Sequence, residues 1–248
     1  MSTIYILWLR QLKRYFRSRA RLIGSIGQPL LFLIALGFGF GPTFQKAGGG
    51  NYIQFLAPGI IAQAVLFTSI STGIEIIWDR QFGFLKETLV APVRRSEIMI
   101  GRTIGGATIA LFQGLLVLII SFMVGFRIEN ILALPLVLLF IILIALLFTA
   151  FGTAIASVLV DMHAFQLIMN FVIMPMVFLS GSLFPLNDLP PLLILVTKMN
   201  PLTYGVDGLR GVLIGKYYIG LLPDLIILTT ITTILLYLGT YLFSKIEI

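Results

Sequence analysis

The stretch ILALPLVLLFIILIALLFTAFGTAIASVLV, residues 131–160, contains no charged side chain. It is longer than the roughly 20 apolar residues that a helix needs to cross a bilayer. It also lacks the alternation of apolar and polar residues that marks the strands of a membrane barrel. Because the backbone of a spanning segment must satisfy its hydrogen bonds internally, the stretch predicts a transmembrane helix, one long enough to tilt or to project from the membrane.

Five further apolar runs meet the same length requirement, so we predict an all-α polytopic membrane protein with six transmembrane helices and a single domain, residues 1–248. The predicted spans are residues 22–40, 55–78, 104–126, 131–160, 165–184 and 221–243. We expect Gln28-Pro29 to interrupt the first of them.

The composition supports a membrane protein. Of the 248 residues, 58% are hydrophobic and 11% are charged, whereas a soluble domain has about 25% charged residues. The mean hydropathy is +1.05. A chain of this kind cannot coat itself with polar groups in water, which excludes a soluble globular enzyme.

Basic residues are distributed unevenly along the chain. The formal net charge is +7, from 17 Lys and Arg against 10 Asp and Glu. One side of the predicted topology holds Arg10, Lys13, Arg14, Arg17, Arg19, Arg21, Arg80, Lys86, Arg94, Arg95, Arg102 and Lys245. The other side holds Lys46, Arg127, Lys198, Arg210 and Lys216. The positive-inside rule then predicts a plasma-membrane protein with both termini in the cytoplasm. The excess of positive charge indicates contact with anionic lipid rather than nucleic acid.

Residues 1–21 form an amphipathic segment before the first span. Its apolar residues recur at helical spacing with basic residues between them, which predicts a helix lying in the membrane interface. The apolar residues are Ile4, Leu7, Trp8, Leu12, Tyr15 and Phe16. The segment either only anchors the first span or also contacts a cytoplasmic partner.

Residues 79–103 form the longest loop on the predicted cytoplasmic side. Phe84, Leu85, Leu89 and Val90 make an apolar stripe on a short helix that we expect to begin near Asp79 and to end at Pro92. Two interpretations stay open. The helix could receive force from a soluble partner, or the segment could be a solvated connector with ordinary positive-inside charges.

Residues 185–218 lie on the predicted outer side and are apolar, but prolines interrupt them. They predict one or two short helices at the outer interface or at membrane depth, covered by protein. Asn200-Pro201 marks a turn, and Asp207 and Arg210 stand three residues apart on the second helix. We expect an ion pair on the helix surface; the alternative is a plug or an outer gate.

Motifs for chemistry are absent from the sequence. The chain has no cysteine and one histidine, His163, which excludes a disulfide and a multi-histidine metal site. No phosphate-loop motif, GxSxG or HExxH occurs, so we expect no ATP site, no metal and no catalytic residue. Asp161 and His163 share a short cytoplasmic turn, which is more often solvated than catalytic.

A few polar residues lie within the predicted spans. Glu75 is the exceptional charge, at the inner end of the second span. It either reaches toward the cytoplasmic interface or contacts the amphipathic segment or a gate. The uncharged polar residues are Gln63, Thr68 and Ser71 in the second span and Gln166 and Asn170 in the fifth. They either join helices or line a weakly polar, aromatic-rich path that suits an amphiphile. The halves of the chain show no repeat, so such a path would form between two copies.

Three stretches resemble the ABC-2 type permeases, most closely the daunorubicin-resistance and nodulation-factor exporters. Residues 83–98, GFLKETLVAPVRRSEI, are similar to the loop between spans two and three of that family. Residues 178–185, FLSGSLFP, resemble the end of its fifth span, and NPLTY at 200–204 with DGLR at 207–210 resembles its outer segment. The loop begins DRQFG, with fewer charges than many relatives carry, which leaves individual ion pairs to a partner unassigned.

The resemblance implies the membrane subunit of an ABC transporter that exports an amphiphilic drug, lipid or glycolipid-like substrate. The chain would not be an enzyme and would hold no cofactor, because a separate ATP-binding subunit would bind ATP and Mg²⁺. Two copies would pair, with spans two and five along the path, the 79–103 loop as coupling loop and 1–21 as connecting helix. The implied coupling residues are Phe84, Leu85, Glu87, Leu89, Val90, Arg94 and Arg95, with Asp161 and His163 as a second contact. The segment 185–218 would be re-entrant. Alternatives are a polysaccharide or lipid exporter of the same frame, an ATPase-independent channel and a membrane enzyme.

Overall fold

A computed structural model describes residues 3–47, 50–90, 92–186 and 190–245 of the chain. Within these residues the fold is helical, which confirms the all-α prediction. The elements are α1 (Thr3–Arg17), α2 (Arg19–Lys46), α3 (Tyr52–Ser71), α4 (Ile74–Gln81), α5 (Phe84–Val90), α6 (Arg95–Met123), the 3-10 turn η1 (Ile131–Ala133), α7 (Leu134–Val158), α8 (Met162–Phe178), α9 (Pro191–Met199), α10 (Pro201–Ile214) and α11 (Leu221–Ser244).

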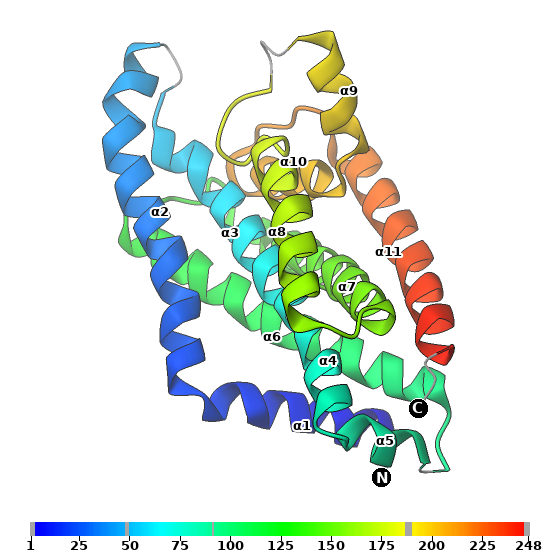
Figure 1. The fold of residues 1–248 in the computed structure, drawn as a ribbon. Helices are drawn as coiled ribbons and strands as arrows, with labels where there is room; N and C mark the ends of the chain where they lie inside the picture. Colours follow the sequence, from blue (N-terminus) through cyan, green and yellow to red (C-terminus); the bar gives the residue numbers. More distant parts are fainter. Residues whose placement is uncertain (1–2, 48–49, 91, 187–189, 246–248) are drawn as a thin grey trace.

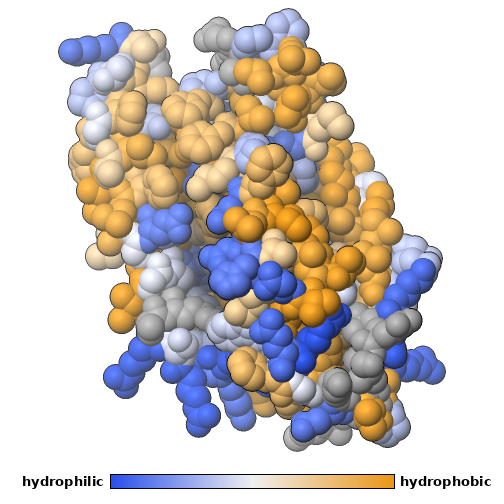
Figure 2. All heavy atoms as spheres, viewed as in Figure 1, coloured by the Kyte–Doolittle hydropathy of each residue, from blue (hydrophilic) through white to orange (hydrophobic). Residues whose placement is uncertain are grey.

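The helices form an elongated bundle with two distinct ends (Figure 1). Helix α1 lies across one end, where α5 also lies and where the last turns of α11 meet the start of α6, and we call this the α1 end. Helices α9 and α10 lie at the opposite end, the α10 end. Figure 2 shows hydrophobic side chains over most of the face toward the α10 end, while hydrophilic ones gather at the α1 end. This distribution suits a molecule whose middle lies in lipid.

Five helical segments of the described residues are long and apolar enough to cross a membrane. They are Leu22–Lys46, Tyr52–Gln81, Arg95–Met123, Ile131–Val158 and Leu221–Ser244. Helix α8, in the fifth predicted span, is apolar but has 17 residues. At about 1.5 Å per residue it falls short of the roughly 30 Å hydrocarbon core. The multi-pass membrane protein is confirmed, and the count of six spans stays a prediction.

Helix α2 continues through Pro29, so the predicted interruption at Gln28-Pro29 is wrong. A proline inside a helix leaves the carbonyl four residues earlier without its N–H donor. Here that carbonyl belongs to Ser25, and Gln113 Nε2 of α6 donates to it at 2.7 Å. The missing backbone bond is therefore replaced from a neighbouring helix, as a buried membrane segment requires.

The predicted second span divides into α3 and α4 at Thr72-Gly73. The Thr72 hydroxyl donates to the Ser69 carbonyl at 2.6 Å, and the backbone of Gly73 lies against the Gly152 carbonyl of α7. Helix α3 runs through the core with residues 56–66 buried, and it packs on α2, α6, α7 and α10. After the break, α4 places its two carboxylates, Glu75 and Asp79, against α1.

Helix α6 begins at Arg95, earlier than the predicted start at residue 104. The early turns of α6 pack against α1. Gly101 and Gly105 provide the room, because a Cβ at these positions would meet the Ile4 backbone and the Gln11 side chain. Residues 95–103, which the sequence pattern places in a polar loop, are therefore helical because they pack against α1.

We expect Gly73→Ala to destabilise the protein, because the added Cβ would lie 2.5 Å from the Gly152 carbonyl oxygen, a backbone atom. Overpacking of this kind costs about 1–3 kcal/mol. The control is Gly39→Ala in α2, where a Cβ meets nothing within 4 Å and helix propensity favours alanine. Thermal unfolding of the purified variants in detergent checks the prediction, and a Gly73→Ala variant as stable as the control would contradict it.

Candidate transport site and its coupling to the α1 end

Asp79 of α4 is the centre of a buried ionic cluster at the α1 end. Arg10 donates to its carboxylate from Nη1 at 3.2 Å and Nη2 at 3.0 Å. Arg102 Nη2 donates at 2.6 Å, and Arg14 Nη1 lies 3.5 Å away. Asp79 is 5% exposed and Arg102 is 2% exposed. The carboxylate therefore holds α1, α4 and α6 together at one point.

Glu75 belongs to the same arrangement, and we call Arg10, Arg14, Glu75, Asp79 and Arg102 the Asp79 cluster. Glu75 is buried, and its Oε2 lies 3.9 Å from Arg14 Nη1. The side chain therefore faces α1, which favours the contact with the amphipathic helix over a reach toward solvent. Glu75, Asp79 and Arg102 are buried, whereas Arg10 and Arg14 reach them from partly exposed positions on α1. Removing a buried member of the cluster leaves a buried partner without its bonding charge.

Two aromatic rings extend the cluster to α5. The Arg10 guanidinium lies 3.6 Å from the centroid of the Phe84 ring. The Arg14 guanidinium lies 5.3 Å from the Trp78 ring of α4. Guanidinium groups are attracted to ring faces at such distances. The arginines of α1 thus bind both the carboxylates of α4 and the first residue of α5.

Arg80 connects the opposite side of α4 to the turn between α7 and α8. Its guanidinium donates from Nη2 to the Ser157 carbonyl at 3.0 Å and from Nη1 to the Leu159 carbonyl at 3.1 Å. These carbonyls end α7, where the helix provides no N–H donors for them. Helix α4 is therefore fixed both to α1 and to the turn before α8.

Asp161 begins α8 as its N-cap. Its carboxylate accepts the N–H of Ala164 at 3.0 Å and of His163 at 3.2 Å, and these bonds hold the pKa of Asp161 below its usual range. Both Asp161 and His163 are exposed. The expected second contact lies on the surface, while the aspartate also has a local structural role.

Some of the predicted coupling residues have exposed side chains, whereas others pack against the rest of the chain. Val90 is 77% exposed and Leu85 is 2% exposed, so Leu85 packs inside the chain rather than facing a partner. Glu87 and Arg94 are exposed, and Arg95 Nη1 donates to the Ser244 carbonyl of α11 at 2.7 Å. Phe84 lies beneath Arg10, and the Leu89 side chain lies outside the described residues. The expected four-residue stripe is therefore not a single outward face.

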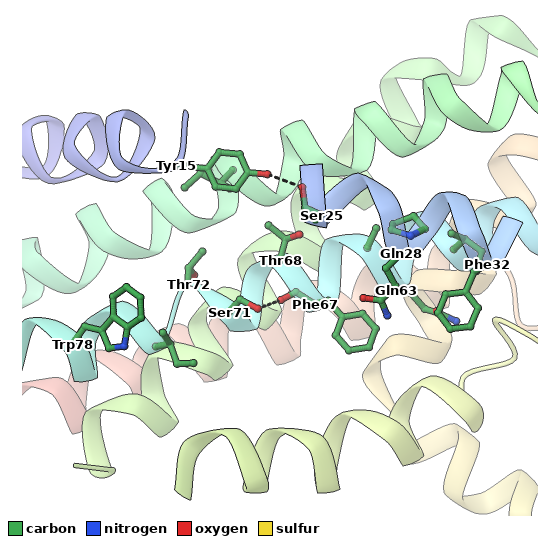
Figure 3. A pocket seen from close by; sticks show the side chains of 16 residues that line it. Tyr15, Ser25, Gln28, Phe32, Gln63, Phe67, Thr68, Ser71, Thr72 and Trp78 are labelled. Atoms are coloured by element: carbon green, nitrogen blue, oxygen red, sulfur yellow. Dashed lines mark hydrogen bonds between the residues drawn. The ribbon is translucent and has the colours of Figure 1, made fainter. Parts of the chain in front are cut away.

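A cavity of about 460 Å³ lies between α2, α3 and the end of α1. Cavities of roughly 300–1,000 Å³ hold small ligands in proteins. It is lined by Tyr15, Gly24, Ser25, Gln28, Pro29, Phe32, Ile60, Gln63, Ala64, Phe67, Thr68, Ser71, Thr72, Ile74, Trp78 and Ile109. None of these residues is Asp, Glu, Lys or Arg. Figure 3 shows the hydroxyl and amide groups gathered along one length of α3 with aromatic rings near both ends.

The predicted path residues fall into two groups. Gln63, Thr68 and Ser71 line the cavity, and Gln63 Nε2 also donates to Ser182 Oγ at 2.8 Å. Gln166 and Asn170 are not among the residues that line it, and both are exposed on α8. The same helix exposes large apolar side chains, including Leu167, Phe171 and Met174. The cavity and the mixed face of α8 are thus separate surfaces of one chain.

At the α10 end, Asn200 and Pro201 start α10. The Asn200 side chain accepts the Leu202 N–H at 3.0 Å and donates to the Met176 carbonyl of α8 at 2.7 Å. Pro201 occupies the first helical position, where no N–H is needed. The turn therefore joins α10 to the end of α8.

The expected surface ion pair between Asp207 and Arg210 is wrong. Both side chains are buried, and each binds backbone groups of another segment. Asp207 accepts the N–H groups of Tyr218 and Ile219, each at 2.7 Å. Arg210 Nη2 donates to the Gly181 carbonyl at 2.9 Å, and its guanidinium lies 3.9 Å from the Phe55 ring. Irregular backbone near membrane depth needs such partners, and the two charges supply them.

We expect Asp79→Asn to cost about 3–5 kcal/mol of stability, because Arg102 would remain buried without the carboxylate that bonds to it. Glu87→Gln on exposed α5 is the control and should change little. The double variant Asp79→Asn with Arg102→Met should recover part of the loss, because the two residues are in contact. Chemical or thermal unfolding in detergent measures these variants and Arg102→Met alone, and a double variant whose loss equals the sum of the two single losses would refute a direct partnership.

Comparison with known proteins agrees with this architecture. The family described as ABC-2 type transporter matches residues 2–214. The chain is 30% identical over 220 residues to ycf38 of Cyanophora paradoxa, a protein named as a transport permease, covering 85% of this chain and 73% of that protein. It is 27% identical over 215 residues to Nodulation protein J of Rhizobium leguminosarum bv. trifolii, covering 85% and 78% of the two chains. It is 28% identical over 207 residues to the inner membrane transport permease YadH of Escherichia coli strain K12, covering 82% and 80%. The chain belongs to the ABC-2 type transporter family.

Proposed function

We propose that this chain is the membrane subunit of an ABC transporter that exports an uncharged or weakly polar amphiphile. A separate ATP-binding subunit, which holds ATP and Mg²⁺, supplies the energy. The family supports a transport permease, and the uncharged cavity with its hydroxyl, amide and aromatic lining supports the substrate class.

The observation that carries the proposal is that α4 belongs to both the cavity and the Asp79 cluster. Ile74 and Trp78 line the cavity, and Asp79 follows Trp78 directly. Asp79 binds α1 and α6, and Arg10 stacks on Phe84 of α5. A displacement of α5 or α1 is thus transmitted through adjacent residues to the cavity wall.

The orientation follows from the charges. The α1 end holds most of the basic residues of the chain, and the positive-inside rule places such an end in the cytoplasm. Both ends of the chain then face the cytoplasm, and the partner ATPase contacts exposed Val90, Glu87 and Arg94 near α5. Asp161 and His163 make a second contact from the turn before α8.

A second copy of the chain completes the path. Helix α8 exposes Gln166 and Asn170 among large apolar side chains, and polar groups facing lipid are costly unless another helix covers them. We assign this face to the partner protomer, so that α3 and α8 of two copies enclose the substrate. The assembly contains two permeases and two ATPases.

The transport mechanism is a change between two packings. Nucleotide binding draws the ATPase subunits together and moves α5, and α4 follows because the Asp79 cluster fixes it. Net export requires that the two packings differ in their affinity for the substrate. The chain itself needs no catalytic group, because the chemistry is ATP hydrolysis in the partner.

We expect Val90→Asp to uncouple transport without unfolding the chain, because Val90 is 77% exposed and a charge there disturbs an apolar contact with the partner. The ATPase activity of the reconstituted pair should lose its stimulation by substrate. Leu132→Asp, at an 85% exposed apolar position near the α10 end, should retain stimulation. Substrate-stimulated activity that survives Val90→Asp would rule out the coupling assignment.

We expect Ser71→Trp to fill the cavity and to abolish stimulation by uncharged amphiphiles while the basal ATPase activity of the pair remains. Ser71 lines the cavity and bonds the carbonyl four residues earlier. Thr230→Trp is the matched control, because Thr230 is also exposed and makes the same kind of bond, but on α11. Equal stimulation in both variants would place the substrate elsewhere.

A further inference from the structure

A buried carboxyl group at the α10 end has no counter-charge bonded to it among the residues that the structure describes. Asp224 lies in the first turn of α11 and is 0% exposed. Among the described residues, no donor reaches either of its carboxyl oxygens. A buried carboxylate without a donor is strongly unfavourable, so the group needs either a cation or a proton of its own.

The neighbour of Asp224 is a second buried carboxyl, Asp207 of α10. Gly220 connects the two residues, because its N–H donates to Asp207 and its carbonyl accepts the N–H of Asp224. Asp207 accepts the N–H groups of Tyr218, Ile219 and Gly220 at 2.7, 2.7 and 3.3 Å. Three backbone donors stabilise the ionised form of a carboxyl. Asp207 is therefore the charged member of the pair, and Asp224 faces a carboxylate.

In the part of the chain that the structure describes, the other groups around the pair provide no cation that bonds to it. Tyr204 of α10 and Tyr217 of the connecting segment are close enough to sense the charge of Asp224. Arg210 is near Asp207, but its Nη2 donates to the Gly181 and Phe55 carbonyls. Helix α7 packs on both α10 and α11 and carries no ionisable side chain.

We propose that Asp207 and Asp224 form a proton-binding site that holds the segments of the α10 end together. Asp224 is neutral there, and its O–H donates to the carboxylate of Asp207. Two carboxyl groups this close and shielded from water cannot both carry a charge, so they share one proton. No bond other than this O–H is made or broken, and the proton comes from water.

The proton shared by Asp207 and Asp224 stabilises the packing of three segments of the chain. Asp207 holds the backbone of residues 218–220, and the Asp224 N–H donates to the Gly220 carbonyl at 3.2 Å. With the proton bound, α10, this connecting segment and the start of α11 form one unit. Without it, two carboxylates repel each other beneath the segment and loosen it. That this end faces the outside rests on the proposed function, whereas the proton site does not.

The first test is the melting temperature of the purified full-length chain in detergent between about pH 6 and about pH 9. The wild type should lose at least about 2 °C toward the alkaline end relative to Asp224→Asn. The asparagine amide donates to Asp207 without titrating, so the melting temperature of that variant should not show this loss. Glu129→Gln, which removes an exposed carboxyl, should behave as the wild type. Melting temperatures that change with pH by the same amount in the wild type and in Asp224→Asn would overturn the proposal.

The second test uses the absence of cysteine from the chain and does not depend on the stability of the variants. Ile219→Cys places a thiol on a partly buried residue whose N–H Asp207 accepts, and Lys216→Cys places one on an exposed neighbour. The ratio of their maleimide labelling rates removes the pH dependence that the two thiols share, and the Asp224→Asn background shows how much of the rest depends on Asp224. The ratio should rise about threefold over the same pH range with Asp224 present and stay constant with Asp224→Asn. A constant ratio in both backgrounds would refute the site. Neither test needs the ATPase, so failure of the proposed transport function would leave both results standing.

Discussion

The carboxylate of Asp79 is the point on which the arrangement of the α1 end depends. It is buried, and it binds arginines from α1 and α6 while it sits on α4. Such a charge is tolerable only while its partners remain in place. The interfacial helix, the break after α3 and the start of α5 therefore have fixed relative positions, although α1 is amphipathic and α5 has seven residues.

Membrane burial imposes a second constraint, which is that backbone groups need partners where helices end or deviate. Gln113 replaces the donor that Pro29 lacks in α2. Arg80 binds the free carbonyls at the end of α7, and Asp207 binds the N–H groups before α11. Each polar side chain sits where regular hydrogen bonding stops. The few charges of an apolar chain are thus used to complete backbone hydrogen bonding as well as to pair with one another.

Hydropathy predicts much of the architecture, because long apolar runs have few alternatives to spanning helices. Helices at five of the predicted spans, the amphipathic segment and the prediction of one or two short helices near residues 190–214 follow from local pattern. The division at Thr72-Gly73 does not, because it depends on the distant Gly152. The early start of α6 likewise depends on α1.

The candidate site was less predictable, because its geometry comes from residues far apart in sequence. Arg102 and Arg80 read as ordinary positive-inside charges, and only the fold shows that one binds Asp79 and the other binds α7. Asp207 and Arg210 suggest a local pair by spacing, yet each has partners elsewhere. Gln63, Thr68 and Ser71 carried a usable signal, since polar residues in a span suggest a cavity or an interface. The contribution of α2 to that cavity, through Gln28 and Phe32, was not apparent.

The most direct measurement of the central claim is the distance distribution between spin labels on α1 and α5. The chain has no cysteine, so Lys13→Cys and Glu87→Cys, both at exposed positions, give two unique labels. If the Asp79 cluster holds these helices in fixed relative positions, double electron–electron resonance spectroscopy will show a narrow distance distribution when the labels are the only changes. The distance distribution will be broad when Asp79→Asn is added. Distributions of equal width in the two proteins would contradict the account.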